Sequence, residues 1–85
     1  MKFIVLVKSP DVTMHKLYSL YGKAMTINQE PYVKIASDEL VLGVPLVQVR
    51  LTEPPTRRGL RVWLHHQHIA IVLGGDERKI GFAND

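Results

Sequence analysis

The sequence predicts a single α+β domain, in which one amphipathic helix packs on a mostly antiparallel, curved sheet of about five or six strands. Three observations lead to this prediction: an apolar stripe at helical spacing, several short segments with alternating apolar residues, and turn-forming residues between them. The 85 residues leave room for one domain, residues 1–85, with a modest core. A small, partly closed barrel is the alternative arrangement of the same strands.

The first strand is expected at Phe3 to Lys8. This segment is apolar on both faces, which is typical of a strand that is central in its sheet. The apolar run ends at Lys8, before it reaches the length of a signal peptide, and no stretch is long enough to span a membrane. The chain has no cysteine, so disulfides, thiolate nucleophiles and cysteine-based metal sites are excluded. We therefore expect a cytoplasmic protein.

The helix is expected over about 10–25. Ser9 is expected to cap it, Pro10 suits its first turn, and Asp11 complements the positive end of its dipole. Apolar residues then recur on one arc, namely Met14, Leu17, Tyr18, Tyr21, Ala24 and Met25. The opposite arc is polar and contains His15, Lys16 and Lys23.

The rest of the chain predicts short strands separated by turns. Alternation and β-branched content place the strands at 32–36, 40–43, 46–51, 60–65, 68–73 and 78–83. Polar residues, proline and glycine place the connections at 28–31, 37–39, 52–59 and 74–77. Within 46–51, we expect Val47, Val49 and Leu51 to face the core, and Gln48 and Arg50 to face outward.

The segment from Leu60 to Leu73 has two interpretations. Its valine and isoleucine content favours two strands joined as a hairpin by a tight turn near His66 and Gln67. The rival interpretation is one helix, with Leu60, Trp63, Leu64, His68 and Ile71 on its apolar face. As a strand, this segment puts Trp63 on the face opposite Leu60, Val62 and Leu64. If the helix covers that face, Trp63 lies in the core, which we favour because large aromatic residues dominate small cores; if the face is open, Trp63 belongs to a binding surface.

Catalytic motifs are absent from the sequence. No serine lies in a Gly-x-Ser-x-Gly elbow, and no helix with Lys-Ser or Lys-Thr follows Gly74-Gly75 to make a phosphate-binding loop. His65, His66 and His68 are the weak candidates for metal ligands, with Asp76, Glu77 or His15 as a third ligand. A polar turn without metal is the favoured interpretation, so we predict a non-enzymatic protein without a cofactor.

Basic residues give the clearest functional signal in this small basic chain, whose net charge is +3. Four arginines surround the double-proline loop with only Glu53 near them in the sequence: Arg50, Arg57, Arg58 and Arg61. Arginine binds carboxylate and phosphate through two parallel hydrogen bonds, and a proline-stiffened loop loses little entropy on binding. Trp63 follows closely, and tryptophan with arginine is enriched at protein–protein hot spots.

We therefore expect a small interaction module that binds an acidic protein surface through these arginines and Trp63, and that forms a homodimer through an open sheet edge. Size and the lack of catalytic motifs suggest, by analogy, a phage or mobile-element accessory or inhibitor protein. The first alternative is a nucleic-acid-binding protein that uses the same loop and the helix face with Lys16 and Lys23. The second is a metal protein or enzyme built on the histidine cluster.

Overall fold

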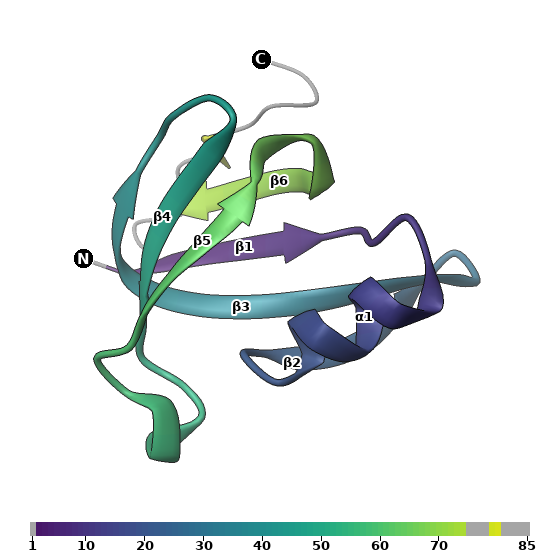
Figure 1. Cartoon of the computed structure of the whole chain (residues 1–85), viewed down its shortest axis with the longest axis horizontal. Helices are drawn as coiled ribbons and strands as arrows, with labels where there is room; N and C mark the ends of the chain where they lie inside the picture. Colours follow the sequence, from purple (N-terminus) through teal and green to yellow (C-terminus); the bar gives the residue numbers. More distant parts are fainter. Residues whose placement is uncertain (1, 75–78, 81–85) are drawn as a thin grey trace.

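The structure is a computed structural model that describes residues 2–74 and 79–80. The elements in chain order are β1 (Phe3–Val7), α1 (Val12–Ser19), β2 (Lys23–Ile27), β3 (Glu30–Val41), β4 (Leu46–Leu51), the 3-10 turn η1 (Pro55–Arg57), β5 (Arg61–His65), the 3-10 turn η2 (His66–His68), β6 (Ile69–Gly74) and β7 (Lys79–Ile80). One α-helix lies against an antiparallel sheet, so the predicted α+β class is confirmed (Figure 1). Among the described residues, no helix has the length and apolarity needed to cross a bilayer.

The sheet has the strand order β5-β4-β3-β1-β6-β7, and β2 adds to the free part of β3. All pairings are antiparallel, and β1 lies in the middle, between β3 and β6. The terminal strands β5 and β7 do not pair with each other, so the sheet is open across the described residues. The barrel alternative is therefore not confirmed.

The core is formed by the inner face of the sheet. Its side chains alternate along the strands as expected for a period of two, and the buried apolar residues are Val5, Val7, Tyr18, Val33, Ile35, Val47, Val49, Leu51, Leu64, Ile69 and Val72. The inward positions predicted in β4 are confirmed. Tyr18 is the buried residue of α1, so the helix covers part of the inner face.

The predicted helix over 10–25 is too long at both ends. Asp11, not Ser9, is the cap residue, because its Oδ1 accepts a hydrogen bond of 2.8 Å from the backbone N–H of Met14. At the other end the helix stops at Ser19. A Cβ at Gly22 would lie 2.4 Å from the carbonyl oxygen of Lys34, so the backbone already lies against β3 there.

The segment that was expected to complete the helix is instead a strand. β2 pairs with β3 in a hairpin, and Asn28 and Gln29 at its turn both have positive φ, of 50° and 67°. Two consecutive residues with positive φ are typical of the type I′ turn, whose twist matches the twist of the flanking strands. Sequence periodicity missed this strand because Ala24 and Met25 also fit the apolar arc of a helix.

The turn predicted at 37–39 is a bulge inside one strand. β3 continues through it for 12 residues, and its register against β4 shifts between Ser37 and Glu39. The extra residue lets the strand bend without ending. The polar triplet Ser37-Asp38-Glu39 therefore marks a bend in a long strand instead of a chain reversal.

The two strands predicted between Leu60 and Leu73 are confirmed as β5 and β6, and the helix alternative is wrong. The predicted hairpin is also wrong, because β5 pairs with β4 whereas β6 pairs with β1. η2 joins them across the open side of the sheet. Lys79–Ile80 forms β7, and the other residues of the predicted turn at 74–77 and strand at 78–83, apart from Gly74, lie outside the described residues.

Candidate functional site

The outer face of β4 and β5 presents Trp63 to solvent. Val62 and Leu64 take the inward positions of β5 opposite Val49 and Val47, so Trp63, between them, points outward beside Gln48. Its side chain is 56% exposed. The expectation that Trp63 lies in the core is therefore wrong: the strand alternates, and the smaller aliphatic residues take the core positions.

Further exposed apolar residues lie near Trp63. Register places Val41 of β3, Gln48 and Trp63 in one row across three strands, and Leu46 one row further along β4. Leu42 and Val44 lie in the connection between β3 and β4. We call the exposed members the Trp63 patch, which comprises Val41, Leu42, Val44, Leu46 and Trp63. Exposed apolar patches of this kind mark interaction sites on soluble proteins.

Arg50 and Arg61 are ion-paired with carboxylates of the β3 bulge. Arg50 forms two hydrogen bonds with Asp38, from Nε at 2.8 Å and from Nη2 at 3.0 Å. Oε2 of Glu39 lies 3.0 Å from Nε of Arg50 and 3.2 Å from Nη2 of Arg61. The hydrogen bonds from Arg50 lower the pKa of Asp38, and Asp38 in turn raises the pKa of Arg50. Glu53 is therefore not the main carboxylate that offsets the arginines.

The other two arginines lie on or beside η1. The guanidinium carbon of Arg57 lies 5.4 Å from the centre of the Tyr21 ring, in a cation–π contact that links the loop to the end of α1. Arg58 is exposed. Gly59 follows with a φ of +87°, a conformation that glycine adopts readily and that turns the chain into β5.

The three histidines around η2 form one cluster. The ring centres of His65 and His66 lie 5.3 Å apart, and those of His65 and His68 lie 5.2 Å apart. Nδ1 of His68 is 2.6 Å from the hydroxyl of Tyr18, and Nδ1 of His65 accepts a bond of 3.3 Å from the N–H of Gln67. Burial and then the charge of His65 lower the pKa of His68. The described residues contain no group of three or more ligand side chains able to hold a metal ion.

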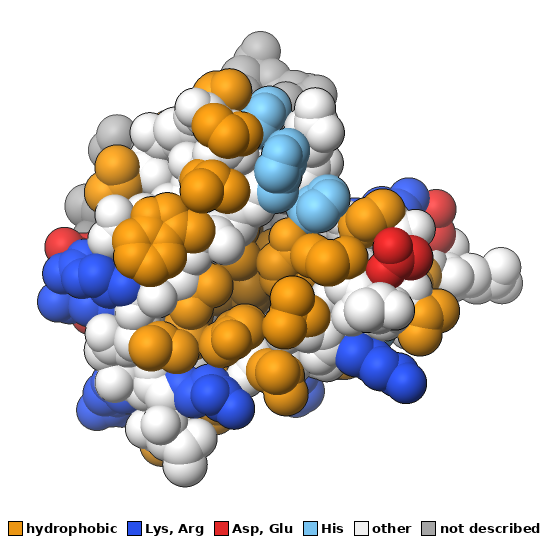
Figure 2. Space-filling view, viewed as in Figure 1, with side chains coloured by type: hydrophobic (Ala, Val, Ile, Leu, Met, Phe, Trp, Pro, Cys, Tyr) orange, Lys and Arg blue, Asp and Glu red, His pale blue; other side chains and the backbone are white. Residues whose placement is uncertain are grey.

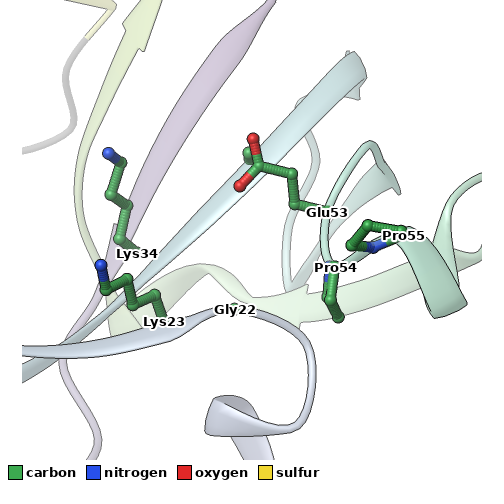
Figure 3. A pocket seen from close by; sticks show the side chains of 7 residues that line it. Gly22, Lys23, Lys34, Glu53, Pro54 and Pro55 are labelled. Carbon is green, nitrogen blue, oxygen red and sulfur yellow. The ribbon is translucent and has the colours of Figure 1, made fainter.

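The lysine face predicted for the helix does not form. Lys16 is on α1, but Lys23 is on β2, where it pairs with Lys34 of β3. These two lysines line a cavity of about 280 Å³ together with Glu53 and the double proline. Figure 3 shows the two lysine side chains extending in the same direction on one side, with Glu53, Pro54 and Pro55 on the other. The cavity therefore lies between the β2–β3 hairpin, which supplies the two lysines, and the connection from β4 to β5, which supplies Glu53 and the prolines.

Comparison with known proteins finds no matching family model, no matching curated protein and no matching solved structure. Function is therefore inferred from the chemistry of the surfaces alone.

The structure brings Arg61 and Trp63 together on β5 and adds partners that the sequence did not indicate. The sequence pattern predicts a turn at Asp38 and Glu39, and so gives no sign of their contact with Arg50 on the neighbouring strand β4. The exposed apolar residues of the β3–β4 connection were missed as well. The sequence contains one signal for this exposure: around Gly43 and Pro45, apolar residues occupy consecutive positions. Neighbouring residues of a strand point to opposite faces, so a sheet with its core on one face leaves half of them exposed.

Proposed function

We propose that this chain is a non-enzymatic module that binds another protein through the Trp63 patch, with the arginines of the η1 loop at its basic end. The observation that carries the proposal is the exposure of Trp63, which is 56%, on a sheet face that it shares with Arg61. A partner that covers this side chain removes a large apolar area from water.

The surroundings of Trp63 support a binding role. The exposed apolar residues of the Trp63 patch extend along one end of the molecule, and Val44 in the β3–β4 connection is 80% exposed. Interfaces that concentrate binding energy combine an aromatic anchor, arginine and a surrounding apolar area. The ion pairs of Glu39 with Arg50 and Arg61 hold these groups in position at the rim of the patch.

Charge supports an acidic partner. From Pro54 to Gly74 the chain contains no aspartate or glutamate, whereas Arg57, Arg58 and Arg61 lie within this segment. Arg58 is exposed and has no ion pair among the described residues. A partner with carboxylates that meet this end of β5 gains electrostatic complementarity, which accelerates association and selects against basic surfaces.

Affinity capture with matched variants tests the proposal. The wild-type chain, Trp63→Ser and Val12→Ser are immobilised at equal density and exposed to the same nuclease-treated extract. Val12 is 71% exposed on α1 and lies outside the Trp63 patch, so its variant controls for loss of an exposed apolar side chain. We expect a captured protein that is retained by wild type and Val12→Ser and is lost with Trp63→Ser. Equal capture by all three baits contradicts the proposal.

A second pair of variants separates protein binding from the nucleic-acid alternative. Arg57→Glu combined with Arg58→Glu is expected to weaken capture, whereas Lys16→Glu combined with Lys23→Glu is expected to leave it unchanged. Nucleic-acid binding instead predicts that nuclease treatment of the extract abolishes capture. It also predicts an affinity for labelled oligonucleotide that falls steeply as the salt concentration rises. Oligonucleotide binding that both double variants weaken equally favours the alternative.

A further inference from the structure

The free edge of β5 has unpaired backbone groups at defined positions. The N–H of Leu51 donates to the carbonyl of Leu60 over 2.9 Å, and the N–H of His66 donates to the carbonyl of Pro45 over 2.8 Å. Residues 60, 62, 64 and 66 therefore direct their backbone groups at β4. Because this direction alternates along a strand, the N–H and C=O groups of Arg61, Trp63 and His65 point away from it. No described strand pairs with β5 on that side.

One end of this edge is closed by α1. The hydroxyl of Tyr18 bonds with Nδ1 of His68, directly after the last residues of β5. Burial raises the pKa of Tyr18, while the contact with the His65 backbone opposes this rise. The open part of the edge is therefore the backbone of Arg61 and Trp63.

Beside this open part, the inner face of the sheet is left uncovered. The inward side chains of β5 and the residue before it become progressively more exposed: Leu64 is fully buried, Val62 is half-buried and Leu60 is 42% exposed. Leu17 on α1 and Leu20 at its end are exposed as well. Figure 2 shows hydrophobic side chains gathered around a hollow between the β4–β5 pair and α1, with histidines on its rim. We call this hollow the β5–α1 groove.

The groove and the edge have the two properties of a strand-addition site. The edge offers main-chain hydrogen bonds, and alternate side chains of an added strand face the groove and the outer face. Those facing the groove would contact the apolar inward side chains of β5 and of the residue before it, Val62 and Leu60. Those on the outer face would lie beside Arg61 and Trp63.

Charge decides which occupant fits. Neither α1 nor the segment from Pro54 to Gly74 contains a carboxylate, and together they contain Lys16, three arginines and all four histidines. A second copy of this chain paired through β5 would bring the same basic groups face to face, which is unfavourable. Glu39 of β3 is the carboxylate that lies beside this edge, 3.2 Å from Arg61, but Arg58 is exposed with no ion pair among the described residues, so an acidic strand still meets a net basic surface.

We propose that the β5–α1 groove binds an extended peptide segment of a partner protein, which alternates apolar and acidic side chains and adds to the sheet as a neighbour of β5. This inference rests on the proposed function, because it specifies how the partner reaches the surface that contains Trp63. The added strand hydrogen-bonds to the backbone of Arg61 and Trp63, packs its apolar side chains on Val62, and directs its acidic side chains toward the basic end of β5, where Arg58 has no ion pair among the described residues.

Peptide selection on the full chain tests the proposal. The probe is a display library of random linear peptides of about 12 residues, long enough to cover the strand edge. We expect enriched peptides with alternating apolar and acidic residues. Because Trp63 is the one tryptophan of the chain, its emission reports binding directly and is expected to shift to shorter wavelength. The backbone amides of Arg61 and Trp63 are expected to become protected from hydrogen exchange.

Backbone methylation of an enriched peptide identifies strand addition. Methylation at alternate amides is expected to weaken binding by about tenfold, and methylation at the intervening amides to change it little, because only every second N–H faces β5. Leu60→Glu, which adds a negative charge at the exposed end of the inward row of β5, is expected to reduce binding about tenfold or more. Val12→Glu, which adds the same charge at an exposed apolar position on α1, is expected to bind like wild type.

Three results would overturn strand addition. The first is failure to select any peptide, and the second is equal sensitivity to methylation at every position. The third is protection of the Arg61 and Trp63 amides in the free chain that rises with protein concentration, which would show that a second copy occupies the edge. If a partner captured through Trp63 is found but leaves these amides exposed, strand addition fails while the proposed function stands. If capture does not depend on Trp63, the proposed function itself fails.

Discussion

At the scale of single residues, Ser37 is a buried polar group without a partner. Its side chain is fully buried on the inner face of β3, and its hydroxyl has no hydrogen-bond partner among the described residues. Burying an unsatisfied hydroxyl costs free energy. We expect Ser37→Ala to raise the free energy of unfolding by about 1 kcal/mol, measured by urea denaturation. A loss of stability of that size would instead show that the hydroxyl is hydrogen-bonded.

His68 gives stability a dependence on pH. Its pKa is lowered in the folded chain by burial and by the charge of His65, whereas the charge of Asp11 opposes this shift. The groups that face its ring are Tyr18 from α1 and His65 from β5. The unfolded chain therefore binds a proton at higher pH than the folded chain does, so stability is fully present above the unfolded pKa and is lost as pH falls below it.

We expect thermal unfolding of the wild-type chain to move to lower temperature between about pH 7.5 and pH 5, the range that spans the unperturbed histidine pKa. His68→Asn removes the titrating ring, so part of this decline is expected to disappear. His15→Asn is the matched control, because His15 lies outside the cluster around η2, and it is expected to keep the wild-type profile. Identical slopes for all three chains would contradict this role of His68.

At the scale of elements, Gly22 decides where α1 gives way to β2. A Cβ at this position would lie 2.4 Å from the carbonyl oxygen of Lys34 and 2.9 Å from Cγ1 of Ile35, so backbone would have to move. We expect Gly22→Ala to destabilise the chain by about 2–3 kcal/mol, through overpacking of this approach. Chemical denaturation measures the loss.

Gly59→Ala provides the comparison for Gly22→Ala. A Cβ at Gly59 would meet no atom within 4 Å, and its only penalty is the positive φ of 87°. We therefore expect a smaller loss of about 1 kcal/mol, and Gly59→Asn, which tolerates this conformation better, to lose less. If the loss at Gly59 exceeded the loss at Gly22, close packing would not be what ends the helix.

Sequence patterns predicted where the helix and strands lie better than which strands pair with each other. β4 and its inward residues follow from strict alternation, and β5 and β6 follow from their valine and isoleucine content. The end of α1 did not follow, because the short distance from Gly22 to Lys34 is a tertiary contact. The sequence also did not show that β5 pairs with β4 and not with β6, because this pairing is a tertiary contact. The three residues of η2, His-Gln-His, give no local signal for either pairing.

The candidate site was also predictable from the sequence only in part. Arg61 and Trp63 share one face because of the strand period, which the sequence contains. The exposure of Trp63 depends on which face of β5 packs on the core, because Val62 and Leu64 take the inward positions, and the neutralisation of Arg50 depends on a bulge that brings Asp38 across from it. Both are properties of the folded chain, so no local pattern reveals them.

At the scale of the whole molecule, the Trp63 patch adds little to folding. Val44 is 80% exposed, and it lies in the connection between β3 and β4. We expect Val44→Ser to change the free energy of unfolding by less than about 0.5 kcal/mol, as surface substitutions usually do. Binding of a hydrophobic fluorescent dye is expected to fall. A large loss of stability would show that the patch is part of the core.

The central place of β1 has a consequence for how the protein forms during synthesis. β1 is made before both of its neighbours, β3 and β6, and Val5 pairs with Ile35 on one side and with Val72 on the other. On the ribosome, β1 therefore has one edge unpaired until the chain has grown past residue 72. Such distant pairing slows folding, because a long loop must close before the contact forms. A nascent chain arrested before Ile69 would expose the apolar edge of β1, which makes that stage the one at which a chaperone is most needed.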